Sequence, residues 1–130
     1  MSGAKKPGMV YVIDDDDSVR KALKRLFRSG DLDVETFPSA EEFLGAPRQE
    51  RKACILIDIR MPGLTGFDLQ QRLASQGMGI PVIVISASDD VQTRERAREL
   101  GAEAFFRKPV DDQALLDAIW WALAGSGKKR

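Results

Sequence analysis

The sequence predicts an α/β protein, with a doubly wound, five-stranded parallel sheet that carries helices on both faces. Three observations lead to this prediction. Five short apolar runs recur along the 130 residues, and each is followed by a segment with helical periodicity. Most of the runs are apolar at consecutive positions, which is typical of strands buried on both faces. Strands that alternate with helices form parallel sheets with right-handed crossovers.

The first two strand–helix units lie in the N-terminal part of the chain. We expect a first strand at residues 9–13 and a second, weaker one at residues 32–37, where apolar and acidic side chains alternate. Between them a helix is expected from apolar residues at helical spacing, which are Val19, Leu23, Leu26 and Phe27. Ser39-x-x-Glu42 matches a capping box and predicts the start of a short second helix.

Three further units complete the pattern. Their strands are expected at residues 53–57, 81–85 and 104–107. The helix after the third strand begins beyond a turn at residues 61–66, and a polar helix follows the fourth strand. On the inner face of this polar helix we expect Val91, Ala97 and Leu100. The last helix opens at Asp111-Asp112 and runs through Leu123.

Five such units in one chain of this length match a flavodoxin-like (βα)5 fold, for which the strand order is 2-1-3-4-5. We expect the domain to span residues 9–123. Residues 1–8 are expected to be a disordered or extended N-terminus, and residues 124–130 a polar tail or linker. The lysines near the N-terminus are not followed by an apolar stretch, so no signal peptide is expected.

The composition excludes several classes of function. The chain has no histidine, so it has no Ser-His-Asp triad and no histidine metal ligand. A bound metal would be held by carboxylates and carbonyls, which favours a hard cation such as Mg²⁺ or Ca²⁺. The single cysteine, Cys54, is expected in the core and indicates a reducing, cytoplasmic location. No apolar run approaches the roughly 20 residues of a membrane span, and zero net charge argues against nucleic-acid binding.

Side chains able to do chemistry follow four of the expected strands. They are Asp14 and Asp15 after the first strand, Asp58 after the third, Ser86 after the fourth and Lys108 after the fifth. Parallel strands end at the same edge of the sheet, where ligands bind in such folds, so these side chains should converge. Neighbouring carboxylates favour a divalent cation, and Mg²⁺ combines few carboxylates with phosphate oxygens. This set is typical of phosphoryl transfer to an aspartate.

Aspartates after a strand also cap helices, and this alternative applies to the acidic run. Asp16 or Asp17 is expected to cap the first helix. For Asp14 and Asp15, taken alone, helix capping and an acidic site both stay open.

Four segments make the sequence resemble the receiver domain of two-component response regulators over nearly the whole chain. They are Val12-Ile-Asp-Asp-Asp16, Ile57-Asp-Ile-Arg-Met-Pro-Gly63, Val84-Ile-Ser-Ala87 and Phe105-Phe-Arg-Lys-Pro109. Asp17-Ser-Val-Arg20 is most similar to the subgroup that regulates nitrogen fixation. The resemblance implies that Asp58 accepts a phosphoryl group with Mg²⁺ as cofactor. The implied metal ligands are Asp15, Asp58 and the backbone carbonyl of Arg60, with Asp14 acting through a bound water.

The resemblance also implies roles for the remaining strand ends. Ser86 and Lys108 would contact phosphoryl oxygens, and the bond between Lys108 and Pro109 would be cis. Ser86 and Phe105 would act as the switch that reports phosphorylation. Serine stands where the family more often has threonine, so the hydroxyl is kept and a methyl group is lost. Two positions that influence phosphate lifetime in the family are occupied by Arg60 and Ser88.

The implied function is one step of a phosphorelay, in which a histidine kinase or a histidine phosphotransfer protein phosphorylates Asp58. The domain would be a signalling module rather than an enzyme. The family uses the face of the fourth helix, fifth strand and fifth helix for homodimers and effector contacts. Trp121 projects from the outer side of the last helix and is expected in or beside that face. Whether the chain is a stand-alone regulator or a fragment with an effector domain stays open.

Two other functions remain as alternatives. A Mg²⁺-dependent phosphohydrolase with an aspartyl nucleophile needs an acid two residues after the nucleophile, where this chain has Arg60, a poor proton donor. A receiver-like docking module that never takes phosphate would have no use for the intact acidic, hydroxyl and lysine positions.

Overall fold

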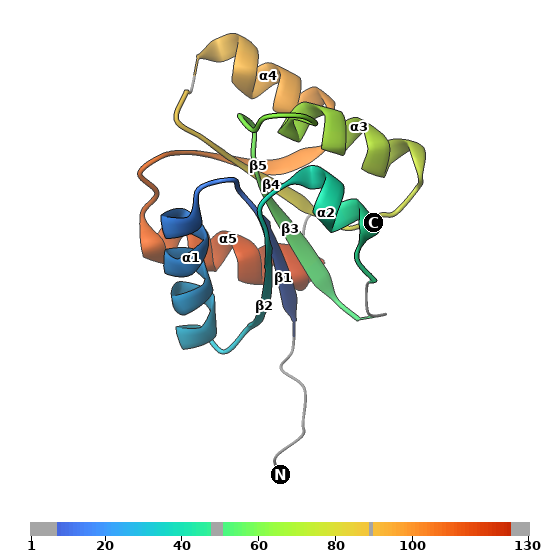
Figure 1. Ribbon diagram of the computed structural model, residues 1–130. Helices are drawn as coiled ribbons and strands as arrows, with labels where there is room; N and C mark the ends of the chain where they lie inside the picture. Colours follow the sequence, from blue (N-terminus) through green and yellow to red (C-terminus); the bar gives the residue numbers. More distant parts are fainter. Residues whose placement is uncertain (1–7, 48–50, 89, 126–130) are drawn as a thin grey trace.

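The computed structural model describes residues 8–47, 51–88 and 90–125, and in them the five predicted strand–helix units follow one another (Figure 1). The strands are β1 (Met9–Ile13), β2 (Asp33–Phe37), β3 (Ala53–Asp58), β4 (Val82–Ser86) and β5 (Ala102–Arg107). They form one parallel sheet in the order β2-β1-β3-β4-β5, which confirms the predicted fold class. Of the two expected tails, residues 1–7 and 126–130 lie outside the described residues.

Helices cover both faces of the sheet, as expected for right-handed crossovers. They are α1 (Asp17–Ser29), α2 (Ala40–Gly45), α3 (Gly66–Ser75), α4 (Val91–Glu99) and α5 (Asp112–Leu123). Helices α1 and α5 lie on one face, and α2, α3 and α4 lie on the other (Figure 1). Because side chains alternate along a strand, the core has two halves: Val10 and Val12 pack towards α1 and α5, whereas Tyr11 and Ile13 pack towards α2 and α3.

Burial follows the position of each strand in the sheet. The central strands β1, β3 and β4 are buried along almost their whole length, as their continuous apolar runs predict. The edge strand β2 is only half-buried, which explains its alternating pattern.

Cys54 is buried in β3, where burial and the charge of Glu103 raise the pKa of its thiol to about 12, so it is a core residue. In the described part of the chain no helix combines the length and apolar character needed to cross a bilayer.

One expectation about the core is wrong. Val91 was expected on the inner face of the polar helix, but it is 74% exposed. It lies six residues before Ala97, which is the buried residue of α4, so at about 100° per residue the two side chains point about 120° apart. Val91 therefore belongs to the solvent side of the first turn, and Leu100, at the end of the helix, is half-buried.

Candidate functional site

The predicted site residues meet at the carboxyl edge of the sheet. Asp14 follows β1, Asp58 ends β3, Ser86 ends β4 and Lys108 follows β5. Between β1 and β3 the sheet order reverses direction, since β2 lies on one side of β1 and β3 on the other. At such a switch point the following loops diverge to opposite faces and leave a crevice. The backbone N–H of Lys108 donates to the carbonyl of Ser86 at 2.8 Å, which fixes the lysine beside the end of β4.

The four consecutive aspartates divide into two functions. Asp16 is the N-cap of α1 and accepts hydrogen bonds from the backbone N–H groups of Ser18 and Val19. Asp17 lies in the first turn of α1 and pairs with basic side chains of that helix. This confirms that capping falls to the later aspartates and leaves Asp14 and Asp15 for the edge of the sheet.

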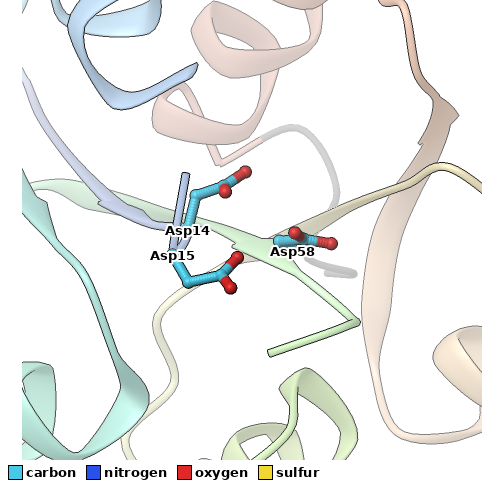
Figure 2. Close-up of side chains that lie close together, drawn as sticks. All are labelled: Asp14, Asp15 and Asp58. Atoms are coloured by element: carbon cyan, nitrogen blue, oxygen red, sulfur yellow. The ribbon is translucent and has the colours of Figure 1, made fainter. Parts of the chain in front are cut away.

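Three carboxylates come together at this edge. Figure 2 shows Asp14 and Asp15 at the end of β1 beside Asp58 of β3. Each offers a carboxylate oxygen, and these oxygens lie within 4.8 Å of one another. Asp14 is fully buried, Asp58 is 5% exposed and Asp15 is exposed. One buried pair and one solvent-facing carboxylate therefore form a compact acidic cluster that is open on the side of Asp15.

Lys108 balances part of this negative charge. Its Nζ donates to Asp14 Oδ2 at 3.0 Å and to Asp58 Oδ2 at 3.3 Å. Burial acts to lower the pKa of Lys108, but its hydrogen bond to Asp14 and the charges of both aspartates outweigh this effect and raise the pKa above its ordinary value. The lysine is therefore a fixed cation in the site.

The surroundings of Asp58 disfavour its charged form. Burial raises its pKa above the ordinary value, and the negative charge of Asp14 adds to this effect. The charge of Lys108 and the backbone N–H of Arg60, which donates to Asp58 Oδ1 at 3.1 Å, act in the opposite direction without reversing it. A raised carboxylate pKa means that the ionised form gains from any further cation placed beside it.

The loop after β3 is held close to Asp58 by a glycine and a capped helix. A Cβ atom on Gly66 would lie 2.8 Å from the Asp58 carbonyl oxygen and from Ile59 Cα, so a side chain there would push the loop away. Thr65 and Asp68 form a reciprocal capping box at the start of α3. These two features were not predicted from the sequence, although glycine before a helical pattern and the Thr-x-x-Asp spacing were signals for them.

Ser86 is buried and its hydroxyl has a partner on the chain. Ser86 Oγ accepts the backbone N–H of Ser88 at 3.1 Å. The Ser88 hydroxyl donates to Asp90 Oδ2 at 2.9 Å, and Asp90 is the N-cap of α4. Hydrogen bonds therefore connect the predicted site residues Ser86 and Ser88 to the N-cap of α4 rather than to the acidic cluster at the end of β1 and β3.

The remaining predicted residues lie outside the carboxylate cluster. The peptide bond between Lys108 and Pro109 is cis, as predicted. Arg60 is exposed at the rim of the site. Phe105 is half-buried in β5, and the guanidinium of Arg94 from α4 lies 5.2 Å from its ring centroid. Trp121 is 52% exposed on α5, which agrees with its expected outward position but does not assign it to an interface.

Another contact missed by sequence reasoning holds the loop between β1 and α1. Arg20 donates from Nη1 to the backbone carbonyl of Asp14 at 2.7 Å and pairs through Nη2 with Asp17. Its side chain is largely buried. The arginine thus ties the acidic loop to the helix that follows it.

Comparisons with known proteins agree with this geometry. A model of the family described as the response regulator receiver domain matches residues 10–120. Nodulation protein W of Bradyrhizobium diazoefficiens is 40% identical over 127 residues, which are 98% of this chain and 56% of that protein. Transcriptional regulatory protein FixJ of Azorhizobium caulinodans is 40% identical over 120 residues, which are 92% of this chain and 57% of that protein.

A solved structure of the response regulator StyR is also similar. It superimposes with a TM-score of 0.84 at 45% identity, and the match covers 93% of this chain and 60% of that one. The likeness to FixJ confirms the similarity to nitrogen-fixation regulators that was read from the sequence. The chain spans little more than half the length of these curated relatives.

Proposed function

We propose that Asp58 is the phosphoacceptor of this chain, which belongs to the family of response regulator receiver domains. The observation that carries this proposal is the position of Asp58, a buried carboxylate at the switch point of the sheet, with Asp14 and Asp15 on one side and Lys108 at 3.3 Å. Burial and the charge of Asp14 raise the pKa of Asp58, and Lys108 offsets this only in part. Phosphoryl transfer would bring a new acceptor for the lysine.

Mg²⁺ fits the donor set of this site. The cluster offers carboxylate oxygens only, which are the ligands that hard cations prefer. Asp14 already accepts from Lys108 and from the backbone N–H of Asp16, whereas Asp15 is exposed. We therefore assign Asp15, Asp58 and the Arg60 carbonyl as direct ligands, with Asp14 acting through water. When bound, the ion would neutralise charge on the carboxylates and on a phosphoryl group.

The chain's own residues would perform the transfer by position and charge. An Asp58 carboxylate oxygen forms the new O–P bond while the P–N bond to the donor histidine breaks, and the bonding pair stays on the imidazole. Lys108 would move from the carboxylates to a phosphoryl oxygen, and its charge stabilises the transition state. Ser86, whose Oγ accepts the Ser88 N–H, would donate its hydroxyl proton to another phosphoryl oxygen.

The donor is an external protein under this proposal, since the chain has no histidine of its own. A histidine kinase or a histidine phosphotransfer protein supplies that chemistry, and the domain is a signalling module that reports phosphorylation to a partner. The curated relatives are nearly twice as long, so we propose that an effector domain reads the receiver in the full protein.

We place the protein in the cytoplasm, where the free thiol of Cys54 stays reduced. We assign Arg60 and Ser88 to the control of phosphate lifetime and Trp121 to an interface beside α4, β5 and α5.

Asp58→Asn tests the proposal directly. With Mg²⁺ and acetyl phosphate, the wild-type chain should take up one acid-stable, base-labile phosphoryl group, and Asp58→Asn should take up none, because the amide is no nucleophile for phosphorus. Intact-mass spectrometry measures the label. The matched control is Asp16→Asn, which removes a neighbouring carboxylate and keeps an N-cap residue. Label retained in Asp58→Asn would move the acceptor elsewhere, and continuous turnover of phosphate esters would favour the phosphohydrolase.

A further inference from the structure

Helix α4 is attached to the body of the domain with very little apolar contact. All nine of its residues are described, and Ala97 is the one that is buried. Val91 is exposed and the remaining side chains are polar or charged. A helix that buries so little apolar surface depends on other contacts for its position.

Two arginines of α4 supply such contacts by lying over aromatic rings. The guanidinium of Arg94 lies 5.2 Å from the ring centroid of Phe105 in β5. The guanidinium of Arg96 lies 5.4 Å from the ring centroid of Phe67 in α3. Gln70 adds a buried hydrogen bond of 3.0 Å from its Nε2 to the carbonyl of Ala97. Arginine over an aromatic face is attractive through the charge of the guanidinium and the quadrupole of the ring.

The ring of Phe105 has open space beside it into which it could move. It lies in a groove of about 280 Å³ between α4 and β5 that Arg94, Glu95 and Arg98 also line. Phe105 itself is half-buried, so the guanidinium supplies part of the cover that a fully packed ring would receive from apolar side chains.

The first turn of α4 is connected to the other switch residue. Ser86 Oγ accepts the N–H of Ser88, and the Ser88 hydroxyl donates to Asp90, whose other oxygen caps α4 through the N–H of Thr93. One helix is therefore in contact with both Ser86, through this chain of hydrogen bonds, and Phe105, through Arg94.

We propose that Arg94 is a positioning residue that couples the ring of Phe105 to α4 and favours the unphosphorylated state of the domain. This inference rests on the proposed function, since it gives Phe105 and Ser86 the role of a switch. In the observed arrangement Lys108 pairs with the carboxylates of Asp14 and Asp58, contacts that it would leave for a phosphoryl oxygen under the proposed function, so the stack of Arg94 on Phe105 belongs to the resting state. A contact made in one state alone shifts the equilibrium towards that state.

The test measures binding of beryllofluoride, a stable analogue of the phosphoryl group, with Mg²⁺ to the full chain by calorimetry. Removing the stack in Arg94→Ala should tighten binding about two- to fivefold, which corresponds to the loss of an exposed cation–π contact from the resting state. The matched control is Arg98→Ala, which removes an exposed arginine one turn later on the same helix and should leave the affinity unchanged. Circular dichroism checks that each variant folds.

A second variant shows whether the effect passes through the aromatic ring. In a Phe105→Leu background the Arg94→Ala change should no longer alter the affinity, because the ring on which it acts is gone. Equal affinities of the wild type, Arg94→Ala and Arg98→Ala would overturn the inference and leave the proposed function intact. Failure of the wild-type chain to bind beryllofluoride, together with failure to take up phosphate, would overturn the proposed function instead. Retention of the Arg94→Ala effect in the Phe105→Leu background would also overturn the coupling.

Discussion

Helices α4 and α5 pack on opposite faces of the same sheet, and they differ in how much apolar surface holds them there. Four residues of α5 are buried, namely Leu115, Ile119, Ala122 and Leu123, and three of them have large apolar side chains. Helix α4 buries Ala97 and otherwise relies on arginine–aromatic stacks and one buried hydrogen bond. Apolar burial contributes about 25 cal/mol for each Å² removed from water, whereas an exposed cation–π contact contributes about 0.5–1 kcal/mol.

This difference separates a helix that stabilises the domain from one that can change position at little cost. Moving α5 would expose apolar surface shared with β1 and β3, because its buried side chains belong to the same core half as Val10 and Leu56. Moving α4 would break a few contacts, each of modest strength, of which two lead to the switch residues Ser86 and Phe105. A signalling domain needs both kinds of helix, since a switch must move against a body that stays folded.

The largest effect on stability is expected in α5, the helix that buries more apolar side chains. Ile119→Ala should lower the free energy of unfolding by about 2–5 kcal/mol, because it leaves a cavity among fully buried side chains. Urea unfolding followed by circular dichroism measures this loss. A loss below about 1 kcal/mol, the range of a site that collapses easily or is already partly open to water, would mean that α5 is packed as loosely as α4.

A smaller effect is expected when the two helix caps are compared. Asp90 caps α4 and Asp111 caps α5, and each side chain accepts one backbone N–H three residues later, at 2.8 Å and 2.9 Å. In Asp90→Ala, amide hydrogen exchange should speed up along most of α4, because few other contacts hold that helix. In Asp111→Ala the increase should stay within the first turn of α5, since the apolar face holds the rest.

The cap of α4 gives a dependence on pH. The hydrogen bonds from the Thr93 N–H and the Ser88 hydroxyl hold the pKa of Asp90 below its ordinary value of 3.8. Stabilisation by this cap is therefore complete above pH 3.8 and is lost as the pH falls through the lower pKa of the folded state. If amide hydrogen exchange sped up equally far along α4 in Asp90→Ala and along α5 in Asp111→Ala, the two helices would not differ in how they are attached.

The sequence was most informative where the backbone alone decides the structure. The continuous apolar runs predicted the central strands, and the residues after those runs had to meet because parallel strands end at one edge of the sheet. Asp14, Asp15, Asp58 and Lys108 were brought together in this way. Helix α5 was predicted from its own periodicity, because Leu115, Ile119 and Leu123 define one face of the helix.

The parts that the sequence did not predict depend on contacts between distant segments. Nothing in the local pattern indicated that Lys108 would bridge Asp14 and Asp58, or that Gly66 would need to be small in order to approach the end of β3. Helix α4 was predicted, but its inner face was not fully predicted, because Ala97 is its one buried residue and a single alanine defines no apolar stripe. The contact of the exposed Arg94 with the ring of Phe105 was not predicted either.

The smallest effect is expected at Val91, and it separates the two interpretations of α4. If Val91 lay on an inner face, as its place in the sequence indicated, truncation to alanine would cost about 1–2 kcal/mol or more through lost packing. The side chain is 74% exposed, so Val91→Ala should change the free energy of unfolding by no more than about 0.5 kcal/mol. A slight gain is consistent with this expectation, since alanine has the higher helix propensity. Urea unfolding beside Ile119→Ala measures both changes on one scale. A loss at Val91 comparable to that at Ile119 would show that α4 is held by apolar packing after all, and that it is not the weakly attached helix on which the coupling through Arg94 depends.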